Sequence, residues 1–437
     1  MEKANQVARP LDNSHGHSSL FFRNARQLLT LAGPPAPRRG RDLGELGIIE
    51  DGAVLTKGAT IHCVGRTRDL VAEARSLNAK VIDCRGRVVM PGFVDCHTHL
   101  VFAGHRLEDY ELRLRGVTGA EIVRRGGGIQ FSARQVAVAT ERALVAQAQT
   151  FLHQFAAYGT TTIEVKSGYG LDVANEIKIL EAVRKLQKVS PLELVPTLMA
   201  GHAIPPKFTN KRAAYVKMME RRLIPLVARK KLAEFVDCFC DRGAFTPEEC
   251  STLLRAGAKR GLIPRIHAEQ IAHTGSTRLA TALEAASADH LDNITAPEIA
   301  DLARSKVVAV LLPGANFHLA TRSMAPARRL IEKGAAVALA TDFNPGTSPT
   351  LNMQFILSLG CSLMRMMPAE AISAATINAA YSLRRADRIG SLEPGKQADL
   401  AVMDVEDYRM IPYYFGWNHC VMTVKNGRIV CSAASAR

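Results

Sequence analysis

Two histidines separated by one residue, His97 and His99, stand at the end of the apolar run VVMPGFVDC (88–96). Side chains two positions apart on a strand point to the same face, so both imidazoles can reach one metal ion where the strand ends. An isolated pair of this kind could equally be two polar residues beside a turn. Because later apolar runs end in further metal-ligating side chains, the pair predicts a metal centre and hydrolytic chemistry.

Three later apolar runs supply those side chains. The run IPRIHAEQ contains His267, ASADHL contains His290, and AVALATDFNPG contains Asp342. Neutral imidazoles and one carboxylate form a ligand set that suits Zn²⁺ or iron and leaves one position for water. The four segments therefore predict one shared metal site.

The elements that must position these residues alternate between short apolar runs and helical stretches, which is typical of a parallel βα array. Strands are predicted over 94–99, 161–166, 193–199, 235–240, 263–268, 286–290, 307–312 and 336–342. Helices are predicted over 132–157, 173–188, 247–260, 276–285, 297–303 and 325–333. Eight such strands predict an α/β fold, a (β/α)8 TIM barrel, whose active site lies at the carboxyl ends of the strands.

Both ends of the chain have a different pattern, with short β segments separated by turns. The segment GIIEDGAVLTKGATIHCVG (47–65) has this character, and so does VMTVKNGRIV (421–430), where Asn426-Gly427 is a strong hairpin signal. We expect residues 21–90 and 389–437 to form one small β-sandwich domain, residues 91–388 to form the barrel, and residues 1–20 to be a disordered tail.

Composition excludes several classes of protein. No apolar stretch approaches the ~18 residues that span a bilayer, and the amino-terminal residues lack the apolar middle of a secretory signal. The nine cysteines have no spacing typical of a disulfide framework. We therefore expect a soluble protein in the reducing cytoplasm, with no membrane partner.

The chain is basic, with 56 Lys and Arg against 41 Asp and Glu, a net charge of +15. The densest basic stretch, 207–231, has few aromatic residues and no nucleic-acid motif, so it is interpreted as a solvated helical face. No specific nucleic-acid partner is predicted. A weaker hypothesis is that the positive field steers an anionic substrate toward the site.

The segments HTHLVFAGHR, GGGI, EVKSGYGLD, HAEQ, SADHL and TDFNPGTSPT, in this order, resemble the amidohydrolase superfamily and, within it, the imidazolonepropionase family of histidine degradation. The resemblance covers essentially the whole chain. It implies hydrolysis of the small anionic cyclic amide 4-imidazolone-5-propanoate to N-formimidoyl-L-glutamate by a metal-activated water. It also implies one Zn²⁺ or Fe³⁺ per subunit and a homodimer.

The same resemblance assigns roles to residues. His97, His99, His267 and Asp342 would hold the metal; Asp342 would also shuttle protons, and His290 would orient or deprotonate the attacking water. Substrate-binding roles fall on Arg106, Tyr169, His202, Gln270, Asn344, Gly346 and Thr347. Plainer explanations stay open for several of them: a surface ion pair for Arg106, simple packing for Tyr169, loop capping for His202, and turn geometry for the NPGT segment.

Three other functions share parts of this pattern. A ring deaminase would share the metal ligands, but many deaminases resemble one another in having Glu where this chain has Gln270, and a neutral amide is a poor proton donor. A two-metal subtype would need a Lys at the end of the fourth strand, FVDCFC, whereas Lys166 ends the second. A non-catalytic scaffold on the same fold would be expected to have lost ligands that this chain retains.

Overall fold

The computed structural model describes residues 19–433, and it contains two eight-stranded sheets. Most of the predicted tail, residues 1–18, lies outside the described residues. Leu20 already begins the first strand, β1 (Leu20–Leu29).

One sheet is an all-parallel barrel in the order β13-β12-β11-β10-β9-β8-β7-β6. This confirms the predicted fold class. Its strands are β6 (Phe93–Asp95), β7 (Thr160–Lys166), β8 (Glu193–Gly201), β9 (Phe235–Cys240), β10 (Ile263–Ala268), β11 (Ser287–His290), β12 (Val308–Leu311) and β13 (Ala336–Leu339).

Two strands end several residues earlier than predicted, and the difference matters for the site. β6 stops at Asp95 and β13 at Leu339, so His97, His99 and Asp342 follow the strands. The predicted strand position of the two histidines is therefore wrong. The reason is that these two ends close the barrel by isolated contacts: His99 N–H donates to Phe343 O (2.8 Å) and Asp342 N–H to His97 O (3.0 Å). The closure brings the ligands of β6 and β13 side by side.

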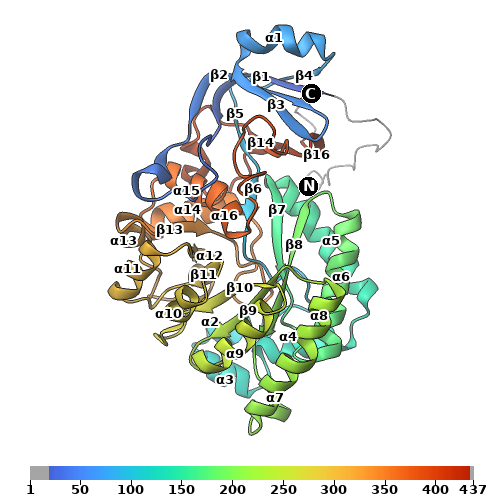
Figure 1. The fold of residues 1–437 in the computed structure, drawn as a ribbon, viewed down its shortest axis with the longest axis vertical. Coiled ribbons are helices and arrows are strands. Elements are labelled where there is room, and N and C mark those ends of the chain that lie inside the picture. Colours follow the sequence, from blue (N-terminus) through green and yellow to red (C-terminus); the bar gives the residue numbers. More distant parts are fainter. Residues whose placement is uncertain (1–18, 434–437) are drawn as a thin grey trace.

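Helices surround the barrel, as Figure 1 shows. The predicted helix 132–157 is two helices, α4 (Gly128–Val138) and α5 (Glu141–Ala157), because Thr140 caps α5 with its side chain. The other predicted helices correspond to α6 (Val173–Val189), α9 (Pro247–Ala258), α10 (Ser276–Ala282), α11 (Ala296–Arg304) and α13 (Ala327–Glu332). Further helices include α2 (Leu107–Leu114), α3 (Gly119–Arg124), α12 (Pro313–Leu319), α14 (Met353–Met364), α15 (Pro368–Ala374) and α16 (Ile377–Ser382).

The basic stretch is helical, as predicted. It forms α7 (Arg212–Met218), a short π-helical turn and α8 (Ile224–Lys230). Tyr215, Leu223 and Val227 are buried, whereas most of the basic side chains are exposed. The cations therefore lie on a solvated face.

The second sheet has the order β16-β15-β14-β5-β1-β2-β3, with β4 beside β1, and it contains segments from both ends of the chain. Its remaining strands are β2 (Ile48–Lys57), β3 (Thr60–Arg66), β4 (Lys80–Asp83), β5 (Val88–Pro91), β14 (Leu400–Met403), β15 (Cys420–Lys425) and β16 (Arg428–Ser432). The predicted Asn426-Gly427 hairpin connects β15 to β16, with φ values of 50° and 69°. In Figure 1 this sheet lies at one end of the barrel, with α1 (Thr67–Ser76) on its far side.

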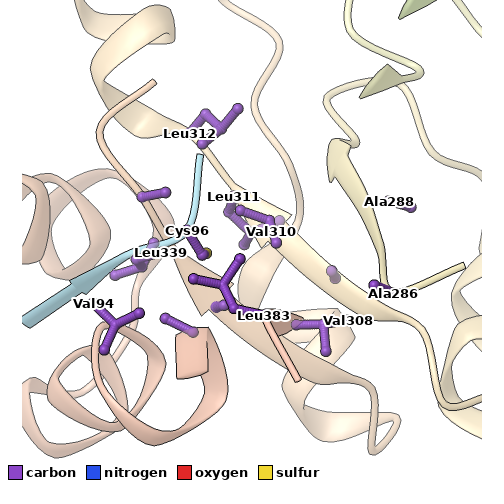
Figure 2. Packing of buried hydrophobic residues seen from close by; sticks show 14 of the residues in the cluster. Val94, Cys96, Ala286, Ala288, Val308, Val310, Leu311, Leu312, Leu339 and Leu383 are labelled. Carbon is purple, nitrogen blue, oxygen red and sulfur yellow. The ribbon is translucent and has the colours of Figure 1, made fainter. Parts of the chain in front are cut away.

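Most barrel strands pack against their helices in one large apolar cluster, and β7 packs against α5 and α6 in a second. Figure 2 shows Val94 of β6, Val308 and Val310 of β12, and Leu383 after α16 in the first of these clusters, and all four side chains are fully buried. Burial of this kind fixes the strand ends that carry the polar residues. No helix in residues 19–433 is both long and apolar enough to cross a membrane.

Candidate active site

Four imidazoles converge at the carboxyl ends of the barrel strands. The ring of His97 lies 4.5 Å from that of His267, 5.7 Å from that of His99 and 5.6 Å from that of His290, measured between centroids. Asp342 joins them, with Oδ1 3.5 Å from His97 Nε2 and 4.0 Å from His99 Nε2. The ligand atoms of His97, His99 and Asp342 all lie within 4.8 Å of one another.

The hydrogen bonds of these rings fit a metal site. His97 Nδ1 lies 2.7 Å from Asp289 Oδ2, and His267 Nδ1 lies 3.1 Å from Asp237 Oδ1. Each carboxylate accepts the Nδ1 proton, which leaves Nε2 with a free lone pair. Both Nε2 atoms are buried without a hydrogen-bond partner. An unpaired buried acceptor is costly, and this carboxylate–histidine arrangement is the one that metal-ligating histidines use.

The surroundings of His97, His99 and His290 favour the neutral form of these imidazoles. Burial, with cationic and imidazole neighbours, lowers the pKa of His97, His99 and His290 well below its ordinary value. Burial and nearby carboxylates raise the pKa of Asp342 well above its ordinary value. Neutral histidines are the form that binds a metal ion.

His290 (φ 78°) and Asp342 (φ 53°) also have left-handed backbone conformations, a form of local strain that concentrates at functional sites.

Three of the predicted substrate-binding residues lie beside this centre. The His202 ring stacks on His99 at 4.9 Å, and its Nδ1 lies 2.9 Å from Gly168 O. Tyr169 lies 5.6 Å from the His99 ring, and the Arg106 guanidinium lies 5.4 Å from the Tyr169 ring. Arg106 is buried and donates from Nε to Ser132 Oγ (2.9 Å), but its Nη2 has no partner. The structure thus brings Arg106, Tyr169 and His202 together.

The NPGT segment forms a compact turn next to Arg106. Asn344 Oδ1 accepts from the N–H groups of Gly346 (2.8 Å) and Thr347 (2.7 Å), and its Nδ2 donates to Asp342 O (2.7 Å). The Asn344 amide is therefore engaged in the turn, as the plainer explanation holds. Gly346 has a separate requirement, because a Cβ there would collide with Nη1 of Arg106.

Comparison with known proteins agrees with this geometry. The sequence model of the Amidohydrolase family matches residues 88–430. The chain is 46% identical to the imidazolonepropionase of Geobacillus kaustophilus (strain HTA426) over 414 residues, which cover 94% of this chain and 97% of that protein. It is 44% identical to the imidazolonepropionase of Brevibacillus brevis (strain 47 / JCM 6285 / NBRC 100599) with the same coverage. The chain belongs to the imidazolonepropionase family.

Solved structures show how widely this family shares its fold. A triazine hydrolase variant superposes with a TM-score of 0.72 over 95% of each chain at 17% identity. Guanine deaminase of E. coli gives a TM-score of 0.68 at 17% identity and covers 95% of this chain and 100% of that chain. A zinc-bound adenosine deaminase of Xanthomonas campestris gives 0.67 at 18% identity, over 95% and 93% of the two chains. At these identities the likeness shows the fold alone.

Gln270 lies on the loop that follows β10, and its backbone is tightly held. The N–H groups of Gln270, Ile271 and Ala272 donate to the Asp241 carboxylate at 2.7, 2.8 and 3.0 Å. The side chain of Gln270 is half-buried. The neighbouring carboxylate, that of Glu269, accepts from backbone N–H groups of Thr274 and Thr277. The carboxylate of Glu269 is thus engaged by the loop backbone.

Sequence reasoning missed the layer of charges beneath the histidines. Glu164 and Lys166 of β7, Asp237 of β9 and Asp289 of β11 are all fully buried inside the barrel. Each stands within a run of apolar residues that forms a strand, and ionisable residues are almost never fully buried unless paired. That placement was the available signal, although only the strand order shows which of these residues meet.

Proposed function

We propose that this chain hydrolyses the ring amide of 4-imidazolone-5-propanoate to N-formimidoyl-L-glutamate, a step of histidine degradation. Members of its family are hydrolases that act on carbon–nitrogen bonds in cyclic amides, and the chain is one of them. The observation that supports the site is the convergence of unpartnered imidazole nitrogens on Asp342, next to the buried Arg106, which pairs with no carboxylate of residues 19–433.

The chain uses a metal cofactor, as its family membership and the clustered histidines and aspartate support. We propose a single Zn²⁺ or Fe³⁺ per subunit, held by His97, His99, His267 and Asp342. Such an ion, when bound, makes water acidic enough to attack at neutral pH and polarises the carbonyl that it attacks. A second, lysine-bridged ion is not favoured, because Lys166 is already hydrogen-bonded to Glu164 and Asp237.

We infer that Asp342 moves the proton. Its carboxylate lies beside Nε2 of His97 and of His99, so it can accept a proton from the attacking water and then deliver it to the ring nitrogen as the carbon–nitrogen bond breaks. Nδ1 of His290 is buried and unpartnered, and its ring lies 5.3 Å from that of His267. The neutral His290 can therefore accept a hydrogen bond from the water and orient it.

We infer that Arg106 holds the propionate of the substrate. Within residues 19–433 it forms no ion pair with Glu108, Asp109 or any other acid, which argues against the plainer surface-pair explanation. A buried guanidinium with a free Nη2 can bind a carboxylate through two hydrogen bonds. Tyr169 and His202 would line the same side of the substrate, and Gln270, Asn344, Gly346 and Thr347 would complete its surroundings. The homodimer and the cytoplasmic location stay predictions.

The test is to incubate the purified protein with freshly made 4-imidazolone-5-propanoate and to follow the loss of its ultraviolet absorbance. We expect turnover by the wild type and a decrease of about 10²- to 10⁴-fold for Asp342→Asn, since a proton-transfer group is lost. Asp399→Asn is the matched control, because Asp399 is equally buried but lies among the residues that join the barrel to the second sheet.

Two outcomes would contradict the proposal. Equal turnover by the wild type and Asp342→Asn would remove the assigned proton transfer. Stoichiometric release of ammonia from a cyclic amidine, with no opening of the imidazolone ring, would identify a deaminase instead.

A further inference from the structure

Lys166 occupies the centre of the barrel directly beneath the histidine cluster. Its side chain is completely buried, and its Nζ donates to Glu164 Oε1 (2.9 Å) and to Asp237 Oδ2 (2.7 Å). The same Nζ lies 3.7 Å from Asp289 Oδ2. One ammonium group therefore faces three carboxylates that come from three different strands.

Two of these carboxylates hold metal-ligating rings. The second oxygen of Asp237, Oδ1, accepts from His267 Nδ1 (3.1 Å), and Asp289 Oδ2 accepts from His97 Nδ1 (2.7 Å). Asp237 thus uses one oxygen for Lys166 and the other for the imidazole. A ring held this way cannot rotate without breaking a charge-assisted hydrogen bond in a buried site.

The third carboxylate, that of Glu164, holds the backbone between His97 and His99. Glu164 Oε2 accepts from the N–H of Thr98 (3.2 Å), the residue between His97 and His99, and Thr98 Oγ1 donates to Glu164 O (2.6 Å). The backbone N–H of Lys166 itself donates to Thr98 O (2.9 Å). The contacts of the ammonium group therefore lead to proposed metal ligands, through Asp237 and Asp289 directly and through Glu164 by way of Thr98.

The charges of this cluster depend on Lys166. Arg265 is a second buried cation beside Asp289, but its Nη2 is closer to Cys96 O (2.8 Å) than to Asp289 Oδ2 (3.4 Å). Burial alone would lower the pKa of Lys166, yet Asp237 and Glu164 raise it, so the lysine stays charged. Without it, only Arg265 would compensate the charges of Glu164, Asp237 and Asp289, and unpaired buried charges are strongly unfavourable.

We propose that Lys166 is a positioning residue for the metal centre: through Asp237, Asp289 and Glu164 it aims the free nitrogens of His267 and His97 at one point. This inference rests on the metal ligands of the proposed function and adds a residue that determines how tightly they bind. Lys166 is not one of the proposed metal ligands or substrate-binding residues, and its Nζ contacts carboxylates that hold those ligands, so its removal should act first on metal affinity.

The test measures Zn²⁺ affinity of the metal-free protein by competition with a chromophoric chelator. We expect Lys166→Met to raise the Zn²⁺ dissociation constant by about 10- to 100-fold, as is usual when a residue that orients a metal ligand is removed. Lys425→Met is the matched control, because Lys425 is also buried and paired with two carboxylates, but at the other end of the barrel. We expect it to keep the wild-type affinity while it destabilises the fold.

A second variant separates orientation from net charge and covers the case in which Lys166→Met does not fold. Glu164→Gln/Lys166→Met removes one charge of each sign, and the amide oxygen introduced at position 164 can still accept from Thr98 N–H. Weakened Zn²⁺ binding by this double variant would support the proposal, because Asp237 would still lack its hydrogen bond.

Three results would overturn the inference: wild-type Zn²⁺ affinity in Lys166→Met, wild-type affinity in the double variant, or equal losses in Lys166→Met and Lys425→Met. Zn²⁺ binding is independent of the substrate. A wild type that binds Zn²⁺ but does not hydrolyse imidazolone-propionate would contradict the proposed function and leave the role of Lys166 to be decided by these affinities.

Discussion

Two buried lysines stand at opposite ends of the same barrel, and each is surrounded by carboxylates. Lys166 lies beneath the histidine cluster, while Lys425 of β15 donates to Asp399 (2.6 Å), Glu193 (3.1 Å) and Gln397 (3.2 Å). The second cluster, which we call the basal cluster, also includes Arg385, whose guanidinium donates to Glu193 (2.8 Å). It joins the second sheet to the amino-terminal end of β8.

The two clusters differ in what remains unpaired. In the described part of the chain, Lys425, Glu193, Asp399 and Arg385 leave no buried side-chain atom without a hydrogen-bond partner. Around Lys166, by contrast, His97 Nε2, His267 Nε2 and Asp289 Oδ1 are buried and unpartnered. Evidently, burial and charge alone do not mark a functional site. A functional site is indicated where a network of hydrogen bonds ends in buried acceptor atoms that have no partner in the described residues and are available to a ligand.

The largest effect is expected from replacing His290, whose buried Nδ1 has no hydrogen-bond partner. We expect His290→Asn to lower kcat by about 10²- to 10⁴-fold, because the group that orients the attacking water is lost. Asn is chosen because it tolerates the left-handed backbone of His290. Steady-state kinetics on imidazolone-propionate would measure the effect.

The same variant should not lose stability. His290 Nδ1 has no partner to lose, so urea unfolding of the metal-free protein should give an unchanged or higher free energy of unfolding. A large loss of stability with normal kcat would place His290 in the fold and not in the chemistry.

Lys425→Met should show the opposite behaviour. It leaves Asp399 and Glu193 without their shared cation in a buried site, so we expect the free energy of unfolding to fall by about 3–5 kcal/mol. kcat/KM of the folded fraction should stay at the wild-type value, because the basal cluster touches no active-site residue. A lowered kcat/KM at full folding would mean that the two ends of the barrel are coupled.

The difference between the clusters also explains how much the sequence could predict. The barrel, its strand order and the proposed metal ligands follow from apolar runs that end in His or Asp, because that pattern is local. The Asn426-Gly427 hairpin is local as well. The prediction of one helix over 132–157 was wrong, because a single capping residue, Thr140, begins a second helix. Strand ends at Asp95 and Leu339 depend on barrel closure, which no local pattern reports.

Partners across strands were beyond the sequence for a physical reason. Lys166 was considered only as a metal bridge and rejected, since β7 is the wrong strand for that role. Its contact with Asp237 depends on the register of β7, β8 and β9, in which Lys166 is opposite Thr197, and Thr197 is opposite Phe235. A separation of 71 residues along the chain gives no hint of this pairing. Residues that act through other residues are therefore the part of a site that needs coordinates.

The loop that carries Tyr169 offers a test with a smaller expected effect. Glu176 of α6 accepts from the N–H groups of Gly168, Gly170 and Leu171, each at 2.8 Å, and so shapes the loop that carries Tyr169. We expect Glu176→Ala to lower the free energy of unfolding by about 1–3 kcal/mol, because buried donors lose their acceptor, and to raise KM more than it lowers kcat. Glu176→Gln, which keeps one acceptor oxygen, should recover part of both. Wild-type KM in Glu176→Ala would show that the loop holds Tyr169 without this carboxylate.

The smallest effect that we expect is a change in the pH dependence of stability at His202. Burial lowers the pKa of His202 from 6.5 to about 3, so the folded protein keeps this ring neutral where the unfolded chain protonates it. The stability that depends on a neutral ring is complete above pH 6.5 and is lost as the pH falls toward the folded-state pKa. The slope for one group is about 1.4 kcal/mol per pH unit.

Urea unfolding of metal-free wild type and His202→Gln at pH 7, 6 and 5 isolates this contribution, because the other buried histidines are common to both proteins. We expect the stability difference between them to change by nearly this slope between pH 6 and 5, in the direction that favours His202→Gln in acid. Parallel pH profiles would show that His202 is protonated in the folded protein, and the neutral, satisfied ring stacked on His99 would have to be abandoned.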